Sequence, residues 1–200
     1  MAIVRNQVPP KSGARAIGMA LRDLRLGKAA SADHLLGGAQ INLSEPLPVY
    51  SLALYDISSG HSLEKARQVG WRYLIDKDGA GQVGFADVRE TADGTRFTGL
   101  AQNRNAERLM DAVHLAQAVA ENMANDCEAR ILDVPALNIS AVWLSGAKPV
   151  FIPYIDPQRL SKAGAKVDVA SDFLDVLVHD ADTAKQQLKK VPPAPFLTRE

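Results

Sequence analysis

The sequence predicts an α+β protein in which an antiparallel β-sheet, a meander plus a C-terminal hairpin, packs against one long central helix. Three observations carry this prediction. Short segments rich in β-favouring residues are separated by turn dipeptides, one helical stretch with an apolar stripe follows them, and β-favouring segments then resume. This order favours antiparallel pairing, because parallel strands need a long crossover between each pair.

The first element expected is a peripheral N-terminal helix over residues 14–26. Its apolar residues recur at spacings of three and four, and Gly27 follows as a stop signal. Residues 28–46 are mostly small and polar and contain a glycine pair, so we expect a long irregular connection there.

The meander is expected in the middle of the chain. A strand at 49–57 and a short helical turn at 62–67 precede three strands at 69–75, 82–89 and 95–101. An Asp-Gly dipeptide separates each pair of these three strands, and such dipeptides tolerate the positive φ of tight hairpins.

The long helix is expected at 106–123, where one continuous apolar stripe would lie across the sheet. Further strands follow at 128–134, 137–144 and 149–154, of which the last two form the C-terminal hairpin. Residues 171–190 have a Ser-Asp cap and weaker apolar spacing, and predict a peripheral C-terminal helical segment.

The expected domain organisation is one α+β domain at 14–190, between a flexible N-terminal segment at 1–13 and a proline-rich tail at 191–200. A chain of 200 residues is long enough to bury a sizeable core. The prolines of the tail cannot continue a helix, so the tail is either disordered or an extended strap over a groove.

Composition excludes several classes of partner. The 23 basic and 23 acidic residues balance, so we expect no nucleic-acid partner. The sequence contains no run of about 18 apolar residues, so we expect no membrane span. Residues 1–8 lack the pattern of a secretory signal. The single cysteine, Cys127, rules out an internal disulfide and a cysteine pair for zinc, so the reducing cytoplasm is the expected location.

Two motifs resemble ligand sites but lack the necessary context. Residues 79–84 match the spacing of a dinucleotide-binding glycine loop, yet the following residues predict a strand where that loop requires a helix. Asp76 and Asp78 resemble the start of a calcium loop, but Ala80 and Asp87 occupy positions that should carry an oxygen ligand and a glutamate. We therefore expect no cofactor and no metal.

Catalytic candidates are few. Cys127 follows the long helix and has acidic neighbours, which disfavour a reactive thiolate. His114 lies within the long helix and could project towards the sheet as a general base. Asp111 lies three residues before it on the same helical face and could orient the imidazole, although surface pairs with this spacing are common.

The predicted C-terminal hairpin is apolar on both faces. Val142, Leu144 and Phe151 alternate with equally apolar residues, so both sides of the hairpin need a cover. That cover is either the C-terminal segment of the same chain or another protein chain. With Phe196 of the proline-rich tail, these residues form the expected interaction surface.

Two classes of function follow from these observations. The first is a non-catalytic protein-interaction or assembly module, which binds a protein partner or a second copy of the chain. The alternative is a small cofactor-independent hydrolase or isomerase, whose cavity lies between the sheet and the long helix.

Overall fold

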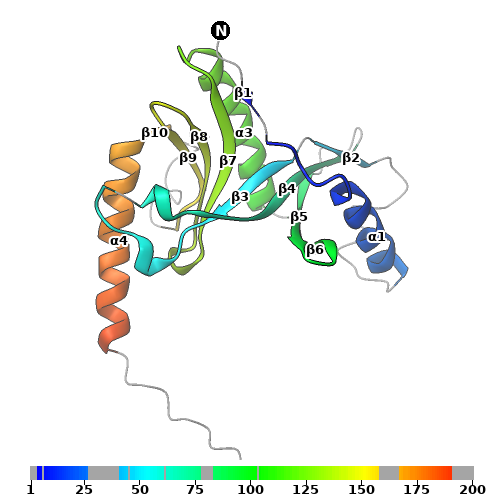
Figure 1. Cartoon of the computed structure of the whole chain (residues 1–200), viewed down its shortest axis with the longest axis horizontal. Coiled ribbons are helices and arrows are strands. Elements are labelled where there is room, and N and C mark those ends of the chain that lie inside the picture. Colours follow the sequence, from blue (N-terminus) through cyan, green and yellow to red (C-terminus); the bar gives the residue numbers. More distant parts are fainter. Residues whose placement is uncertain are drawn as a thin grey trace, which may run out of the picture.

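The computed structural model describes residues 4–5, 7–26, 41–44, 46–60, 62–77, 83–102, 104–157 and 167–190. The α+β prediction is confirmed, and the described sheet is mostly antiparallel (Figure 1). The strands are β1 (Val4–Arg5), β2 (Ile41–Leu43), β3 (Leu47–Ser51), β4 (Arg67–Lys77), β5 (Val83–Thr91), β6 (Gly94–Ala101), β7 (Cys127–Val134), β8 (Ile139–Ser145), β9 (Val150–Ile155) and β10 (Asp168–Val169). The helices are α1 (Gly13–Leu26), α3 (Arg104–Glu121) and α4 (Ala170–Lys190), and the 3-10 turns are η1 (Leu54–Asp56), η2 (Leu63–Lys65) and η3 (Pro135–Leu137).

The sheet is built from two runs of strands that start side by side at its centre. The strand order is β10-β9-β8-β7-β3-β4-β5-β6, so the chain runs outward from β3 to one edge and later outward from β7 to the other. Strands β3 and β7 meet in parallel, with Val49 opposite Ile131, and β1 also pairs in parallel with β7. Each outward run ends in a helix, α3 after β6 and α4 after β10. The sequence did not predict this central parallel contact.

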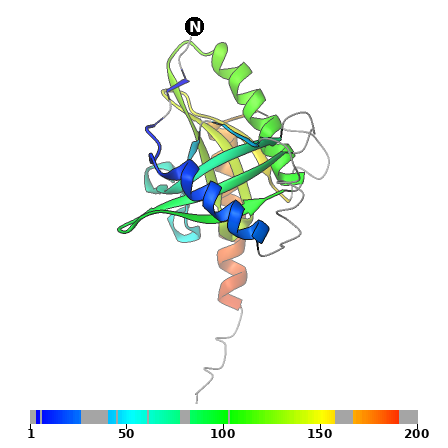
Figure 2. The ribbon, with the colours of Figure 1, turned by 90° about the vertical axis from the view of Figure 1, so that its right-hand side faces the viewer.

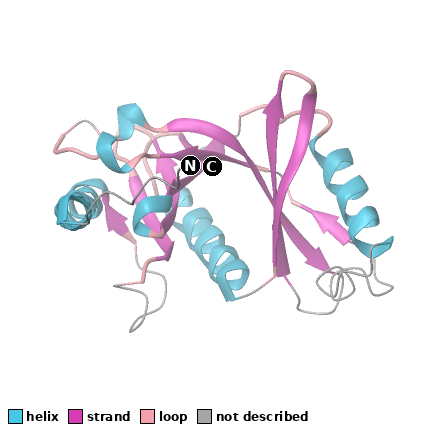
Figure 3. Cartoon of the chain, turned by 90° about the horizontal axis from the view of Figure 1, so that it is seen from below, coloured by secondary structure: helices cyan, strands magenta, loops and turns pink. Residues whose placement is uncertain are grey.

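The three helices cover both faces of the sheet. Figure 3 shows α3 between the two arms of the bent sheet, with α4 and α1 outside them. Figure 2 shows α1 lying across one end of the sheet. Side chains alternate between the faces of a strand, so each of the strands β3 to β9 contributes to the α3 core and to the core under α1 or α4.

Helix α4 is a main part of this architecture, whereas the sequence predicted a peripheral segment. It is one continuous helix, and its residues Phe173, Leu177 and Ala181 are fully buried against β8 and β9. The ring of Phe173 stacks on that of Phe151 at 4.3 Å between centroids. The apolar stripe that produces this packing ends at Ala184, and residues 186–190 of α4 are exposed, which explains the weak signal of this helix in the sequence.

Two other segments differ from the expectation. Residues 41–43, predicted within an irregular connection, form β2 and pair with the end of β4. The strand predicted at 49–57 ends at Ser51, because Leu52, Leu54 and Ile57 turn through η1 to pack under α4. Residues 78–82 lie outside the described residues, but Asp76 pairs with Val83, so this segment joins two antiparallel strands as predicted.

The regular register of the sheet is interrupted at three places. The shifts lie between Val49 and Tyr50 in β3, Asp87 and Val88 in β5, and Ser140 and Ala141 in β8. Such bulges bend a strand and redirect its side chains. All three lie close to Asp87 or Asp133, two charged residues described below. No helix in the described part of the chain is both long enough and apolar enough to span a bilayer.

Candidate functional site

The catalytic candidates from the sequence lie on the outer surface of α3. Both His114 and Asp111 are exposed, whereas Leu109, Ala112 and Ala116 of the same helix are buried against the sheet. The space between α3 and the sheet around these residues is therefore packed core, and the imidazole does not project into it. Nothing in this geometry gives His114 the role of a general base.

Cys127 begins β7 and is buried. Burial raises the pKa of its thiol, and the nearby Asp126 carboxylate raises it further, so the thiol remains protonated at neutral pH. Among the described residues no group of three or more His, Cys, Asp or Glu side chains could hold a metal ion.

Three residues of the predicted interaction surface are internal. Val142 and Leu144 lie under α3, and Phe151 lies under α4, each with no more than 1% of its surface exposed. The two apolar faces of the hairpin are therefore covered by helices of the same chain, which corrects the placement of this surface. Phe196, its fourth member, lies outside the described residues.

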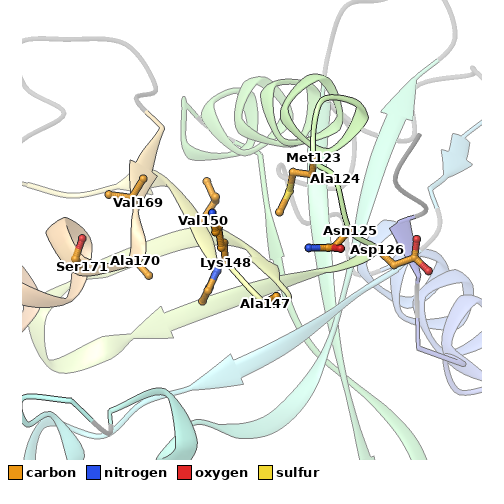
Figure 4. Close-up of a pocket in the computed structure, with 11 residues that line it drawn as sticks. Met123, Ala124, Asn125, Asp126, Ala147, Lys148, Val150, Val169, Ala170 and Ser171 are labelled. Carbon is orange, nitrogen blue, oxygen red and sulfur yellow. The ribbon is translucent and has the colours of Figure 1, made fainter.

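An apolar groove is open at the β10 edge of the sheet (Figure 4). It has a volume of about 580 Å³ and lies between the end of α3, the β8–β9 hairpin and the start of α4. Met123 lines it from one side and Val150 and Val169 from the other. The polar residues of its wall are Asn125, Asp126, Lys148 and Ser171.

The groove exists because α3 ends before it reaches the edge of the sheet. Val169 pairs directly with Val150, so the two side chains share the face that α3 covers elsewhere. Val150 is half-buried, whereas Val169, one strand further out, is 54% exposed. The apolar sheet face that α3 covers therefore extends beyond the end of this helix, to the β10 edge. The sequence contained no signal for this, because helix length and strand order together decide it.

A second feature is a cluster of charged residues on the α3 face of the sheet, around the buried Arg72. The guanidinium of Arg72, on β4, donates from Nε to Oδ1 of Asp87 at 2.7 Å and from Nη2 to Oδ2 at 2.8 Å. The same Nη2 donates to Oδ2 of Asp133, on β7, at 3.3 Å, and Nη1 donates to the hydroxyl of Tyr154 on β9. The ring of Phe85 lies 4.3 Å from the guanidinium carbon. One arginine therefore links four strands.

The electrostatics of this cluster follow from its burial. Desolvation opposes the charge of Arg72, but the oxygen atoms of Tyr154, Asp87 and Asp133 outweigh it, so its pKa is raised. Burial raises the pKa of Tyr154 above its ordinary value, and the phenol stays neutral. Burial also raises the pKa of Asp133, and the opposing effects of Arg72 and the Ser140 hydroxyl do not cancel the shift.

A cavity of about 240 Å³ lies beside the two aspartates of this cluster. It is bounded by the ends of β3 and β7 and by β4, β5 and β6. The aspartate side chains are 27% and 22% exposed, whereas Arg72 is 8% exposed and does not line the cavity.

The sequence analysis missed these residues, although a signal was present. Arg72, Asp87 and Asp133 are charged residues whose two chain neighbours are apolar or aromatic, as in Trp-Arg-Tyr, Ala-Asp-Val and Leu-Asp-Val. A charged residue at such a position is rarely buried without a partner. Pairing the three charges with each other requires the strand order, which local pattern does not contain.

When the chain is compared with protein-family models, with curated proteins and with solved structures, no match is found.

Proposed function

We propose that the protein is an interaction module that binds an extended segment of a partner protein along β10 and in the adjacent groove. The observation that carries this proposal is the uncovered apolar face at the sheet edge, with Val169 54% exposed above a groove of about 580 Å³. Contiguous exposed apolar surface of this kind is typical of binding sites.

The backbone of β10 supports an extended occupant. In the described part of the chain, β10 pairs with β9 on one side and with no strand on the other. A strand that is added to the edge of a sheet pairs with it through main-chain hydrogen bonds, while its alternate side chains enter neighbouring pockets. A partner segment beside β10 would direct every second side chain towards Val150 and Met123.

The lining indicates which side chains the partner contributes. Valine, methionine, alanine and proline form most of the groove wall, while Lys148 and Asp126 are single opposite charges. We therefore infer a segment with apolar residues at alternate positions and no strong net charge. A volume of about 580 Å³ accommodates more than one such side chain and lies in the range of about 300 to 1,000 Å³ found for ligand sites.

The test uses the full chain and a library of displayed extended peptides. Selected peptides are titrated by NMR, with the methyl groups of Met123, Val150 and Val169 as reporters. The variant Val169→Lys places a charge in the groove at an exposed position, so it should leave the fold intact and weaken binding by about tenfold or more. Val8→Lys is the matched control, because Val8 is 87% exposed and does not line the groove.

Peptides that shift these methyl signals and lose affinity only in the Val169 variant would support the proposal. If no peptide is selected, or if both variants bind equally, the groove is not the binding surface. The groove could instead bind a second copy of the chain, and light scattering of the free chain tests this alternative. If the chain forms a dimer that dissociates in the Val169→Lys variant, the partner is a second copy.

A further inference from the structure

We propose that the pocket between α4, η3 and the end of β9 binds a primary ammonium group on a short aliphatic chain. The pocket has a volume of about 210 Å³. The residues that α4 contributes to it lie between 180 and 187, whereas the groove at β10 is lined only by the first two residues of this helix. The two sites therefore share none of the described residues.

The pocket contains a buried carboxylate that has no partner among the described residues. Asp180 is 9% exposed, and no hydrogen bond or ion pair joins its carboxylate to another residue in this part of the chain. The side chain lines the pocket and its oxygen atoms are not fully enclosed, so a ligand there can contact them. A buried charge without a partner is costly, and an ammonium group would compensate it.

Other hydrogen-bond acceptors lie around Asp180. Asp156, at the end of β9, lines the same pocket and is 2% exposed, and it also takes part in another interaction within the chain. Thr183 and Gln187 follow Asp180 at spacings of three and seven, so they lie on the same face of α4. The Thr183 hydroxyl donates to the carbonyl of His179 at 3.0 Å, which leaves its oxygen able to accept. An ammonium group has three donors for such a set.

No positive charge in the described wall balances the carboxylates. The described residues that line the pocket include no lysine, arginine or histidine. Lys185 of the same helix does not line it, because its Nζ donates to the carbonyl of Ile57 at 2.8 Å and lies 3.4 Å from Oδ1 of Asp182. A ligand in the pocket therefore meets negative charge, which favours a cation.

The remaining wall favours an organic cation over a metal ion. Leu137, Ile139, Pro157 and Ala184 supply apolar surface for the carbon atoms of an alkyl chain. Calcium and magnesium take six or more oxygen ligands, and the described residues contain no group of three or more His, Cys, Asp or Glu side chains that could hold a metal. The volume of about 210 Å³ is below the range of about 300 to 1,000 Å³ of drug-sized ligand sites, so a ligand of a few heavy atoms fits best.

The probe is n-butylammonium, titrated into the full chain and followed by the methyl NMR signals of Ile139 and Ala184. 1-Butanol is the neutral control, because it has nearly the same shape without the charge. The ammonium should shift these signals saturably, and the alcohol should not. Asp180→Asn removes the charge at nearly constant shape and should weaken ammonium binding by about tenfold or more.

Asp182→Asn is the matched control variant. Asp182 lies on the same helix, but its side chain is 60% exposed and does not line the pocket, so binding should be unchanged. Without ligand, Asp180→Asn should unfold at the same temperature as the natural protein or at a higher one, because the amide removes an uncompensated buried charge. A lower midpoint would show that the carboxylate has a partner within the chain, and would overturn the inference.

A free amine and a lysine side chain of a partner protein present the same ammonium group. Comparing n-butylammonium with a lysine whose two backbone ends are blocked as amides distinguishes these sources. Tighter binding of the blocked lysine would assign the pocket to a partner side chain, and tighter binding of n-butylammonium would assign it to a free amine.

Four further results would overturn the inference. These are no saturable shift with either ammonium compound, equal shifts with 1-butanol, equal affinity in the Asp180 and Asp182 variants, or saturation of the same signals by calcium or magnesium, which would assign the pocket to a metal. None of these outcomes depends on whether a peptide binds at β10, so the two proposals fail separately.

Discussion

Arg72 is the residue that connects the members of the charged cluster. It is 8% exposed in its side chain and holds two carboxylates and one phenol on three other strands. Burying such a set contributes little net stability, because each charge loses its hydration. Removing the arginine has a larger effect on stability, because the carboxylates then stay in the sheet without a positive charge beside them.

Arg72→Met should therefore destabilise the protein strongly, by about 3 to 5 kcal/mol in the free energy of unfolding. The measurement is urea denaturation at neutral pH. Lys185→Met is the control, because Lys185 pairs with the exposed Asp182 and with the carbonyl of Ile57, and should cost no more than about 1 kcal/mol. A loss below about 1 kcal/mol for the Arg72 variant would contradict this role.

Asp133 should behave in the opposite way. Because burial raises its pKa, the folded protein holds this proton more tightly than the unfolded chain does. The ionised group thus costs stability at neutral pH, and the cost disappears as the pH falls through the raised pKa towards the ordinary value. Asp133→Asn should be more stable than the natural protein at pH 7, with a difference that shrinks on acidification. A variant that is less stable at pH 7, or a difference independent of pH, would contradict the shift.

The bulged strands are the elements that shape the cavity, and one of them, β5, approaches β4 very closely at Gly70. A Cβ atom at Gly70 would lie 2.4 Å from the backbone oxygen of Val88, next to the bulge in β5. A glycine is required here because no side chain fits between the strands, although its φ is not positive.

Gly70→Ala should consequently destabilise the protein by about 1 to 3 kcal/mol, since the backbone of β5 must move. Gly99→Ala is the matched control on β6, where a Cβ would meet nothing within 4 Å. Alanine at that position should be neutral or should stabilise the strand by about 0.5 to 1 kcal/mol. The measurement is the thermal unfolding midpoint of both variants. Equal midpoints would show that β5 can move away from position 70 at little cost.

For the molecule as a whole, the two outward runs of strands do not form separable halves. Helix α3 follows the first run but contacts β8 and β9 of the second as well as β5. The N–H group of Leu52, after the first central strand, also donates to the carbonyl of Asp133 on β7. The described residues therefore share one network of packing across the sheet.

This sharing predicts a single cooperative unfolding transition. The chain has two tryptophans, Trp71 in the α1 core and Trp143 in the α4 core. Trp71→Phe and Trp143→Phe each leave one reporter, and among the described residues neither indole N–H has a hydrogen-bond partner that would be lost. The two fluorescence transitions should coincide with the far-UV circular dichroism of the same variant. Separate midpoints would indicate halves that unfold independently.

The sequence by itself determined the class of fold and the approximate position of most helices and strands. Periodicity and turn residues are local, and these places agree with the structure: α1, the β4–β6 meander, α3 and the β7–β9 strands. The tertiary structure decided the rest. The parallel β3–β7 contact, the covering of Phe151 by α4 and the pairing of Arg72 with Asp87 and Asp133 join residues distant in the chain. Both candidate sites depend on such contacts, which are set by strand order and helix length and leave no local pattern in the sequence.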